Sequence, residues 1–341
     1  MNGTWSTIMA DDFDDFLPKE PDPENVRPEP ISAKNPLKMG IVGHGFVGKA
    51  VEYAFYHPMV DHFLVDPKYN TSIDNLIDWG PQIVFVCAPT PQNSETGFVD
   101  ASIVEDAVLK LMHHTPAFVI VKSTVTPDIV DRLYNSIDPN NFDRFAYNPE
   151  FLTEKSACED FVNAEHHVFG GTDKACDELQ QIYDIFSSCK SDKYYRMSAC
   201  EASFVKYATN AFLATKLTFF NQLRDVVDSF DCSYNMITRA MGADDRIGIK
   251  HTRVPGPDKK RGFGGACLPK DTMAFLKFSE TRAKKFDLLE NVLTINNKYR
   301  IMYELDEREK VNNITFGDAN EHNGQTEEEL KDQDNRSSVG E

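Results

Sequence analysis

Long apolar segments are absent from this sequence of 341 residues. No stretch reaches the roughly 18 consecutive apolar residues that a membrane-spanning helix requires. Residues 1–10 have neither a charged start nor a sustained apolar run, so we expect no secretory signal peptide. These absences predict a cytoplasmic protein that does not enter a membrane.

Positive charge and paired cysteines are also scarce. The 36 Lys and Arg residues are outnumbered by 54 Asp and Glu, and the net charge of -18 disfavours a nucleic acid or an anionic membrane as partner. The seven cysteines show no paired spacing, which predicts neither a disulfide framework nor a zinc site. In a reduced cytoplasm, their thiols remain available for chemistry.

Both ends of the chain have no apolar periodicity. Residues 1–38 are rich in acids and proline, and residues 311–341 are rich in acids. This composition predicts disordered, solvated acidic tails, and a binding role for either tail stays open. The 41% hydrophobic content of the chain still allows about two folded domains between the tails.

Residues 39–198 alternate short apolar runs with helical patterns. The runs typical of strands are Met39–Val42, His62–Val65, Ile83–Ala88, Ala117–Lys122, Arg144–Tyr147 and His167–Phe169. Helical patterns lie between them at Val47–Tyr56, Ser102–Met112, Pro127–Asn135 and Asp173–Phe186. Continuous apolar runs are typical of strands buried on both faces of a parallel sheet. The alternation therefore predicts an α/β domain with a doubly wound parallel sheet.

Residues 199–310 follow a wholly helical pattern. From Ala199 to Ser229 there is no Pro or Gly, and apolar residues recur at helical spacing on more than one face. Such a helix would be about 45 Å long, and it could join two domains and support dimerisation. Further helices are predicted near Tyr234–Met241, Asp271–Ala283 and Leu288–Glu309.

A glycine motif of the form G-x-G-x-x-G follows the first predicted strand. Gly43 permits a tight turn, Gly45 lets a pyrophosphate approach the backbone, and Gly48 lets the helix pack closely on the strand. The N–H groups at the start of that helix, including those of Phe46 and Val47, would face the phosphates. A tight strand–helix turn without a ligand is the alternative.

Asp66 ends the next predicted strand, where a carboxylate suits both ribose hydroxyls and repels a 2′-phosphate. This favours NAD over NADP, although Lys68 weakens the preference. Together with the glycine motif it predicts a Rossmann domain that binds NAD. The segments Pro89-Thr90-Pro91 and Lys122-Ser123-Thr124 lie at strand ends where ligands bind in such sheets, but each could also be an ordinary turn.

One cysteine stands in a glycine-rich, charged segment. Residues 262–271 read Gly-Phe-Gly-Gly-Ala-Cys-Leu-Pro-Lys-Asp. The small residues let a substrate approach the sulfur of Cys267, and Lys270 supplies a positive charge that favours the nucleophilic thiolate. From the local pattern alone, Cys267 could be a nucleophile or a bystander in a tight turn.

Taken together, these segments resemble the UDP-glucose/GDP-mannose dehydrogenase family. The matching segments occur in family order over about residues 39–300. They are Gly43–Gly48, Pro89-Thr90-Pro91, Lys122-Ser123-Thr124, Asn148–Leu152 with Glu154, Lys206 with Asn210, Arg246-Ile247-Gly248 and Gly262–Asp271. The resemblance implies a Rossmann domain that binds NAD, followed by an all-helical domain like that of 6-phosphogluconate dehydrogenase.

The resemblance also implies a reaction. Members of the family oxidise the C6 alcohol of a nucleotide sugar to a carboxylate and reduce two NAD, and UDP-glucose to UDP-glucuronate is the expected case. Cys267 would trap the intermediate aldehyde as a thiohemiacetal and then carry a thioester. Lys206 would stabilise the oxyanion, with Asn210 on the same helix face. Glu154, Asp271 and Thr124 would position or activate the water.

The implied binding residues form two sets. For the cofactor they are Gly43, Gly45, Phe46, Val47, Gly48, Asp66, Pro89, Thr90 and Thr124. For the substrate they are Glu150, Phe151, Leu152, Lys206, Asn210, Arg246 and Gly264. In relatives the arginine that matches Arg246 reaches into the partner subunit's site. Lys206 could instead extend from an apolar surface, and Arg246 could pair only with local acids.

Two departures from the family pattern stand out. Lys155-Ser156 replaces the glycine that usually follows the glutamate at position 154. Relatives also continue into a second Rossmann-like domain that binds the substrate's nucleotide, whereas here the helical pattern gives way to acids near Val311. We therefore expect that domain to be missing. A dimer partner, a separate protein or a smaller substrate could fill its place. Independently, we expect a homodimer through the long helix of residues 199–229.

Two other functions remain open. A two-electron dehydrogenase of the hydroxyacid type would share the fold and the lysine–asparagine pair, but it would not need Cys267. A non-catalytic NAD-binding protein would need none of the reacting residues. The joint presence of Cys267, Lys206, Asn210 and Asp271 favours the four-electron enzyme over both.

Overall fold

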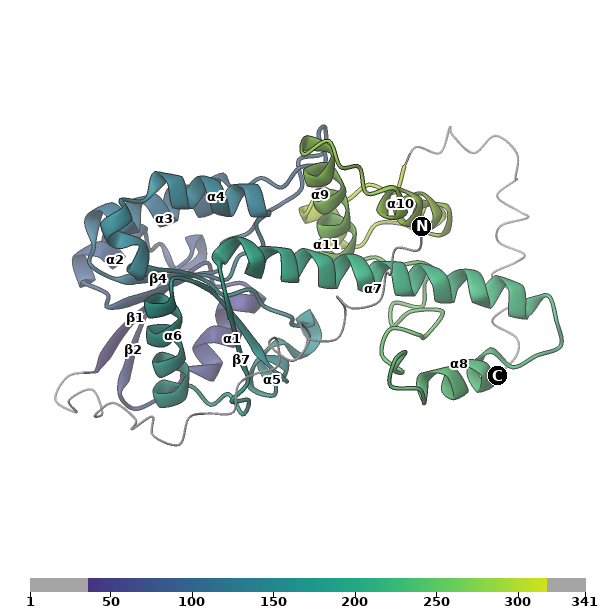
Figure 1. The fold of residues 1–341 in the computed structure, drawn as a ribbon, viewed down its shortest axis with the longest axis horizontal. Coiled ribbons are helices and arrows are strands. Elements are labelled where there is room, and N and C mark those ends of the chain that lie inside the picture. Colours follow the sequence, from purple (N-terminus) through teal and green to yellow (C-terminus); the bar gives the residue numbers. More distant parts are fainter. Residues whose placement is uncertain (1–35, 318–341) are drawn as a thin grey trace, which may run out of the picture. The chain divides into compact units, whose positions relative to one another are not determined.

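The computed structural model describes residues 36–317, which form two compact units (Figure 1). The first unit comprises the residues up to 88, 107–123 and 134–202, and the second comprises 89–106, 124–133 and the residues from 203 onward. The predicted acidic tails, 1–38 and 311–341, lie outside the described residues except for 36–38 and 311–317.

A seven-stranded sheet forms the centre of the first unit, in the order β2-β1-β3-β4-β5-β6-β7. The strands are β1 (Leu37–Val42), β2 (Val60–Val65), β3 (Ile83–Val86), β4 (Phe118–Val121), β5 (Phe145–Tyr147), β6 (His167–Gly171) and β7 (Tyr194–Met197). The β1 to β5 neighbours pair in parallel, whereas β6 runs antiparallel to β5 and β7 runs parallel to β6. The predicted α/β class is confirmed, with an inverted two-strand edge that the sequence pattern did not reveal.

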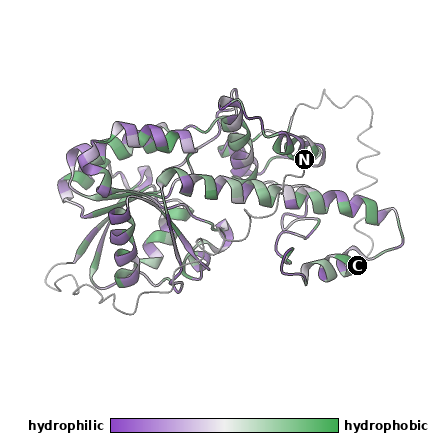
Figure 2. Ribbon diagram, in the orientation of Figure 1, coloured by the Kyte–Doolittle hydropathy of each residue, from purple (hydrophilic) through white to green (hydrophobic). Residues whose placement is uncertain are grey.

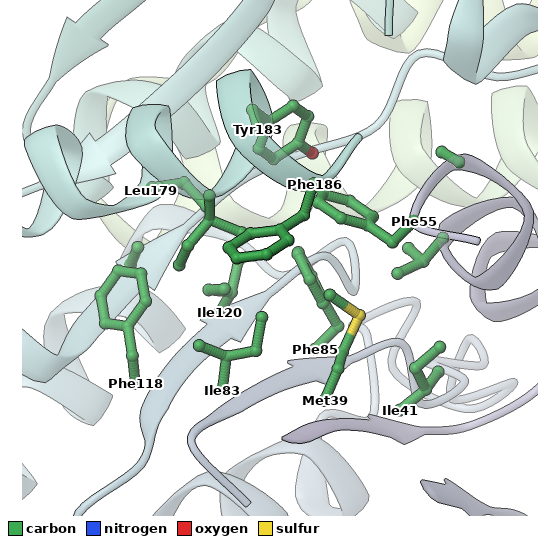
Figure 3. Packing of buried hydrophobic residues seen from close by; sticks show 14 of the residues in the cluster. Met39, Ile41, Phe55, Ile83, Phe85, Phe118, Ile120, Leu179, Tyr183 and Phe186 are labelled. Atoms are coloured by element: carbon green, nitrogen blue, oxygen red, sulfur yellow. The ribbon is translucent and has the colours of Figure 1, made fainter. Parts of the chain in front are cut away.

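Helices cover both faces of this sheet. On one face α1 (Phe46–Ala54), α5 (Ala157–Val162) and α6 (Asp173–Phe186) bury apolar side chains in a shared core. Figure 3 shows this core, in which the rings of Phe55, Phe85 and Tyr183 lie close together. On the opposite face lie α2 (Ile73–Trp79) and residues 107–114 of α3 (Ser102–His114) (Figure 1).

Three short elements of the first unit were not predicted. β7 is an edge strand of half-exposed and exposed residues, so it has no continuous apolar run. α2 and α5 are only seven and six residues long, too short for a clear helical period. The start of α2 was nevertheless marked in the sequence, because Ser72 and Asn75 form a capping box there.

Helices build the second unit. Its longest element is α7 (Ala199–Asp228), which has the predicted extent and belongs to this unit from Ser203 onward; hydrophobic and hydrophilic positions alternate along it (Figure 2). The other helices are α8 (Tyr234–Gly242), α9 (Cys267–Thr281), α10 (Asp287–Arg300) and α11 (Glu307–Val311), with α4 (Pro127–Ser136) contributed up to residue 133. Apolar residues of α7, α9 and α10 share one core. Within residues 36–317 no helix has the length and apolarity to cross a bilayer.

The prediction of a single helix over Leu288–Glu309 was wrong. α10 ends at Arg300, the chain turns, and α11 begins after Asp306. Asp306 accepts hydrogen bonds from the backbone N–H groups of Arg308 and Glu309, while the Glu309 side chain accepts one from the N–H of Asp306. This reciprocal cap starts a new helix and ends the continuity that apolar spacing alone suggested.

Candidate active site

The turn after β1 has the geometry of a dinucleotide-binding loop. Gly43 adopts φ +86°, and a Cβ there would lie 2.5 Å from the Cys87 carbonyl oxygen. A Cβ on Gly48 would lie 2.1 Å from the Gly43 carbonyl oxygen, so α1 can approach β1 only with glycine at this position. A Cβ on Gly45 meets nothing within 4 Å, which leaves open space at the start of α1. The loop therefore fits a pyrophosphate approaching the N-terminus of α1.

Asp66 follows β2 and lies against this loop. Its carboxylate accepts hydrogen bonds from the backbone N–H groups of His44 (2.8 Å) and Lys68 (3.1 Å). Partial burial acts to raise the pKa of Asp66, but these hydrogen bonds and the Lys68 charge hold it below its ordinary value. The Lys68 ammonium donates to the His44 carbonyl oxygen at 2.6 Å and lies 3.9 Å from the carboxylate.

The His44 side chain is a feature of this loop that sequence reasoning missed. It is buried, and its two ring nitrogens lie 2.9 Å from the Tyr69 hydroxyl and 2.7 Å from the Glu52 carboxylate. The loop is thus anchored through both nitrogens of one side chain. In the sequence, the one sign of this role was that His44 is a polar residue between Gly43 and Gly45.

The other predicted residues of the first unit follow β5. Glu150 is buried, and its carboxylate accepts a hydrogen bond from the Leu152 N–H at 2.6 Å. The Phe151 ring lies 5.8 Å from that of His166. Glu154 is exposed and begins a single 3-10 turn, Glu154–Ser156, which also contains the two residues that depart from the family pattern.

In the second unit Cys267 is the first residue of α9. This corrects the expectation that the helix begins near Asp271, since the helix starts one turn earlier and includes the cysteine. The N-terminus of a helix favours a thiolate because the unpaired N–H groups there carry partial positive charge. Asp271 lies four residues further on, on the same face of α9.

Asp271 lies in a buried cluster, where its carboxylate contacts one side-chain amide and one ammonium group. One carboxylate oxygen accepts a hydrogen bond from the Asn210 side-chain amide at 2.6 Å, and the other pairs with the Lys270 ammonium at 2.7 Å. Asn210 lies one helical turn after Lys206 on α7, and all four side chains are buried. The structure thus brings together Asn210 and Asp271, two residues of the predicted site, and it adds Lys270, which the predicted site did not include.

Thr90 reaches the same cluster from the segment after β3. Its hydroxyl oxygen lies 3.5 Å from the Lys270 ammonium. Pro89 precedes it in the same unit, and Thr124 is half-buried just before α4. The Ser203 hydroxyl donates to the Val125 carbonyl oxygen at 2.7 Å, which fastens the Thr124 segment to α7.

The glycine loop that precedes Cys267 is held by side chains from α7 and α10. The Asn221 side-chain oxygen accepts from the Gly262 N–H at 2.8 Å. The Asn296 side chain bonds both backbone groups of Phe263, at 2.6 and 2.9 Å. Sequence reasoning missed both asparagines, because each lies far from the loop along the chain and has no local motif.

Arg246 lies in the turn that follows α8. Its side chain is 89% exposed, and it pairs with the Asp244 carboxylate at 2.6 Å. The loop after it is held by Lys216, whose ammonium donates to the carbonyl oxygens of Ile247, Gly248 and Lys250. In this chain Arg246 therefore contacts a local acid and remains accessible to another molecule.

Two segments of the chain match domains of one known protein family. Residues 68–187 match the NAD binding domain of the UDP-glucose/GDP-mannose dehydrogenase family, and residues 200–298 match its central domain. The UDP-glucose 6-dehydrogenase of Rickettsia felis is 31% identical over 234 residues, which are 67% of this chain and 50% of the relative. That of Rhizobium meliloti is 33% identical over 229 residues, 64% of this chain and 51% of the relative.

Among solved structures, a UDP-glucose dehydrogenase from Pyrobaculum islandicum superposes with a TM-score of 0.65 at 25% identity, covering 79% of this chain and 69% of that one. The chain spans about half the length of the curated relatives it matches. Its NAD-binding and central segments together account for more than half of its residues, and both come from one family. The chain therefore belongs to the UDP-glucose/GDP-mannose dehydrogenase family and has the NAD-binding domain of that family.

Proposed function

We propose that this chain oxidises the C6 alcohol of a nucleotide sugar to a carboxylate, with UDP-glucose as the preferred substrate and UDP-glucuronate as the product. The observation that carries the proposal is the placement of Cys267 on the first turn of α9, one turn before the buried Asp271–Lys270–Asn210 cluster. A two-electron dehydrogenase needs no such thiol. The relatives named UDP-glucose 6-dehydrogenase support the choice of sugar nucleotide.

NAD, when bound, accepts a hydride from the substrate carbon in each of the two oxidations. The residues that would hold it are Gly43, Gly45 and Gly48 around the pyrophosphate, with Asp66 at the ribose hydroxyls. We further propose that Phe46, Val47, Pro89, Thr90 and Thr124 complete the cofactor site. The open space at Gly45 supports the placement of the pyrophosphate at this loop.

Cys267 would hold the reacting carbon between the two oxidations. The alcohol loses a hydride and a proton and becomes an aldehyde, and the Cys267 thiolate adds to its carbon to form a thiohemiacetal. Loss of a second hydride and proton leaves a thioester. Water then adds to the thioester carbon, the C–S bond breaks, and the carboxylate leaves while the thiolate is restored. The helix N-terminus at Cys267 would stabilise the thiolate both before it adds to the aldehyde and after the product is released.

The buried cluster would orient the polar groups around the reacting carbon. Lys206 would stabilise the oxyanion of the tetrahedral species, and Asn210 is held by Asp271. Because both oxygens of Asp271 are engaged, we assign it a positioning role beside Lys270. Glu154 and Thr124 are proposed to position the water, and Glu150, Phe151, Leu152, Arg246 and Gly264 to contact the substrate.

We also propose a homodimer formed through α7. Phe212, Phe219 and Val226 recur every seven residues along one face of this helix and are 66%, 54% and 59% exposed. A row of apolar side chains of this kind is typical of an interface rather than of a solvated surface. A reducing compartment such as the cytoplasm would keep the Cys267 thiol available.

The test is turnover with UDP-glucose, with GDP-mannose as the comparison sugar, counting NADH formed per sugar consumed. Two NADH per UDP-glucose are expected. The Cys267→Ser variant should lose steady-state turnover by at least about a thousandfold and accumulate aldehyde-level material, because a serine hydroxyl stays protonated at neutral pH and is a far weaker nucleophile than a thiolate. Cys232→Ser is the matched control, since Cys232 is an exposed thiol of the same unit.

Normal turnover of Cys267→Ser would rule out the covalent mechanism. A single NADH per sugar would point to the two-electron dehydrogenase instead. Retained NAD binding with no turnover of any nucleotide sugar or 3-hydroxyacid would contradict both enzymatic functions and favour a non-catalytic NAD-binding protein.

A further inference from the structure

The segment that follows α10 folds back onto the glycine loop before Cys267. Residues 306–317 lie beyond the residues matched to the family's central domain, which end at 298. The segment contains α11 and two buried apolar side chains, Ile314 and Phe316. Glu309, on α11, is fully buried. A buried carboxylate requires hydrogen-bond or ion-pair partners, and the partners of Glu309 show which parts of the chain this segment holds.

Glu309 joins the backbone of the glycine loop to a buried arginine. One of its carboxylate oxygens accepts the Gly265 N–H at 2.9 Å and pairs with the Arg300 guanidinium at 2.7 Å. Its other oxygen accepts the Asp306 N–H, which fixes the side chain to its own helix. The loop is therefore tied to α11 two residues before Cys267.

Arg300 forms the surface on which the loop rests. Its guanidinium also pairs with Asp258 at 2.6 Å, and the residue is 1% exposed. A Cβ on Gly264 would lie 2.1 Å from the Arg300 side-chain nitrogen and 2.4 Å from the Glu309 carboxylate. Glycine at position 264 is thus required by the ion pair itself. Any displacement of this pair would change the room available to the loop.

Residues 306–317 also form hydrogen bonds with the segment after β3 that contains Thr90. The Asn312 carbonyl oxygen accepts the Gln92 N–H at 3.3 Å, and the Asn313 side chain donates to the Gln92 carbonyl oxygen at 3.0 Å. Thr90 lies two residues earlier and faces Lys270. Residues 306–317 therefore contact both the loop before Cys267 and the segment in which Thr90 meets the buried cluster.

We propose that Glu309 is a positioning residue, which holds Gly265 through its backbone N–H so that Cys267 is kept at the N-terminus of α9. Asn221 and Asn296 fix the earlier part of the loop, and Glu309 fixes its last turn. The catalytic consequence rests on the proposed function, in which Cys267 is the nucleophile. The holding of the loop does not, and it can be measured without turnover.

The experiment compares the full chain carrying Glu309→Ala, Glu309→Gln and Glu307→Ala with the wild type. Glu307 is an exposed residue of the same helix that pairs only with Lys310 among the contacts described, so it controls for changes in α11. Amide hydrogen exchange is followed at residues 262–267, and kcat and KM are measured with NAD and UDP-glucose. Glu309→Gln keeps an oxygen acceptor for Gly265 and Arg300.

In Glu309→Ala we expect exchange at residues 262–267 to accelerate by at least about tenfold while the strands of the first unit keep their protection. We expect kcat to fall by about tenfold to a hundredfold, because a small displacement of a nucleophile is enough for such a loss, with KM for NAD unchanged. Glu309→Gln should show a smaller effect on both, and Glu307→Ala should match the wild type. This graded order distinguishes positioning from a general loss of stability.

Unchanged exchange at residues 262–267 in Glu309→Ala would overturn the proposal. Faster exchange with an undiminished kcat would also overturn it, since it would show that Glu309 holds the loop but does not position Cys267. If Glu309→Ala does not fold, the same two measurements on Glu309→Gln decide. If the wild type turns over no nucleotide sugar, the proposed function fails, while the exchange measurements still decide whether Glu309 holds the loop.

Discussion

Three glycines of the turn after β1 differ in the reason for which each is required. Gly43 needs a left-handed backbone, Gly48 needs space for the carbonyl of Gly43, and Gly45 meets no protein atom within 4 Å of a built Cβ. The first two requirements concern folding and the third concerns a ligand. A substitution at Gly45 should therefore separate NAD binding from stability.

We expect Gly45→Ala to weaken NAD binding by about tenfold, or ~1.4 kcal/mol, because its methyl group would enter the space assigned to the pyrophosphate. Its free energy of unfolding should be unchanged or slightly raised, since Gly45 has an ordinary φ of -74°. Calorimetric titration with NAD and urea unfolding measure the two quantities.

Gly48→Ala is the matched comparison. Its methyl group would meet the Gly43 carbonyl oxygen at 2.1 Å, so we expect a loss of stability of about 1–3 kcal/mol together with weaker NAD binding. Equal losses of stability in Gly45→Ala and Gly48→Ala would show that the loop is not built as described.

Among the elements, α7 combines two tasks on different faces. One face contributes Lys206 and Asn210, with Tyr207 and Ala211 in the core of the second unit, and another exposes Phe212, Phe219 and Val226. The helical pattern in the sequence showed apolar residues on more than one face. The structure identifies which of them are buried within the chain and which are exposed.

We expect Phe212→Lys/Phe219→Lys to convert the proposed homodimer to a monomer in analytical ultracentrifugation. Each half-exposed ring would contribute about 1–2 kcal/mol when buried at an interface, so the double variant should weaken dimerisation by roughly a hundredfold or more. Tyr56→Lys, which changes an 85% exposed ring of the first unit, should leave the oligomeric state unchanged. A wild type that is monomeric at micromolar concentration would contradict the proposed interface.

The extent of most elements was predictable because it depends on local patterns. The start of α1 follows from the glycine motif, and α7 runs from Ala199 because no Pro or Gly interrupts it. α10 and α11 were merged in the prediction, since apolar spacing continues across a turn that only the Asp306–Glu309 cap reveals. The capping residues were visible in the sequence, but their effect depends on Glu309 being drawn into the interior.

At the scale of the whole molecule, stability should depend on pH through a buried histidine. His167 begins β6, is buried, and lies 4.8 Å from the Tyr183 ring between centroids. Burial, and to a lesser degree the charge of Lys122, lowers the pKa of His167 to about 3. Its Nε2 has no hydrogen-bond partner among the described residues.

The direction of the effect follows from proton binding. An unfolded chain protonates a histidine near pH 6.5, whereas folded His167 stays neutral down to about pH 3. Below pH 6.5 the unfolded state therefore binds more protons, and the free energy of unfolding falls as the pH falls. Between pH 7.5 and pH 5 this one group should remove about 2 kcal/mol.

We expect His167→Phe to abolish that part of the pH dependence while the stability at pH 7.5 changes little, because an aromatic ring of similar shape replaces an unpartnered one. Urea unfolding of the first unit at pH 7.5 and pH 5, followed by the fluorescence of Trp79, measures it. His114→Gln, an exposed histidine of α3, is the control and should keep the wild-type dependence. An undiminished pH dependence in His167→Phe would contradict the neutral state of the buried ring.

Local patterns along the chain were sufficient to predict the α/β class, the NAD-binding loop and the long helix. Each of these features is encoded by residues close together in the sequence, where spacing and residue type determine the local structure directly. The antiparallel placement of β6, the buried hydrogen bond of Asn210 to Asp271, and the side chains of Asn221, Asn296 and Glu309 that hold the cysteine loop were settled by folding. They join residues far apart in the chain, and no local pattern reports which distant donor and acceptor will share a desolvated interior until the chain has packed.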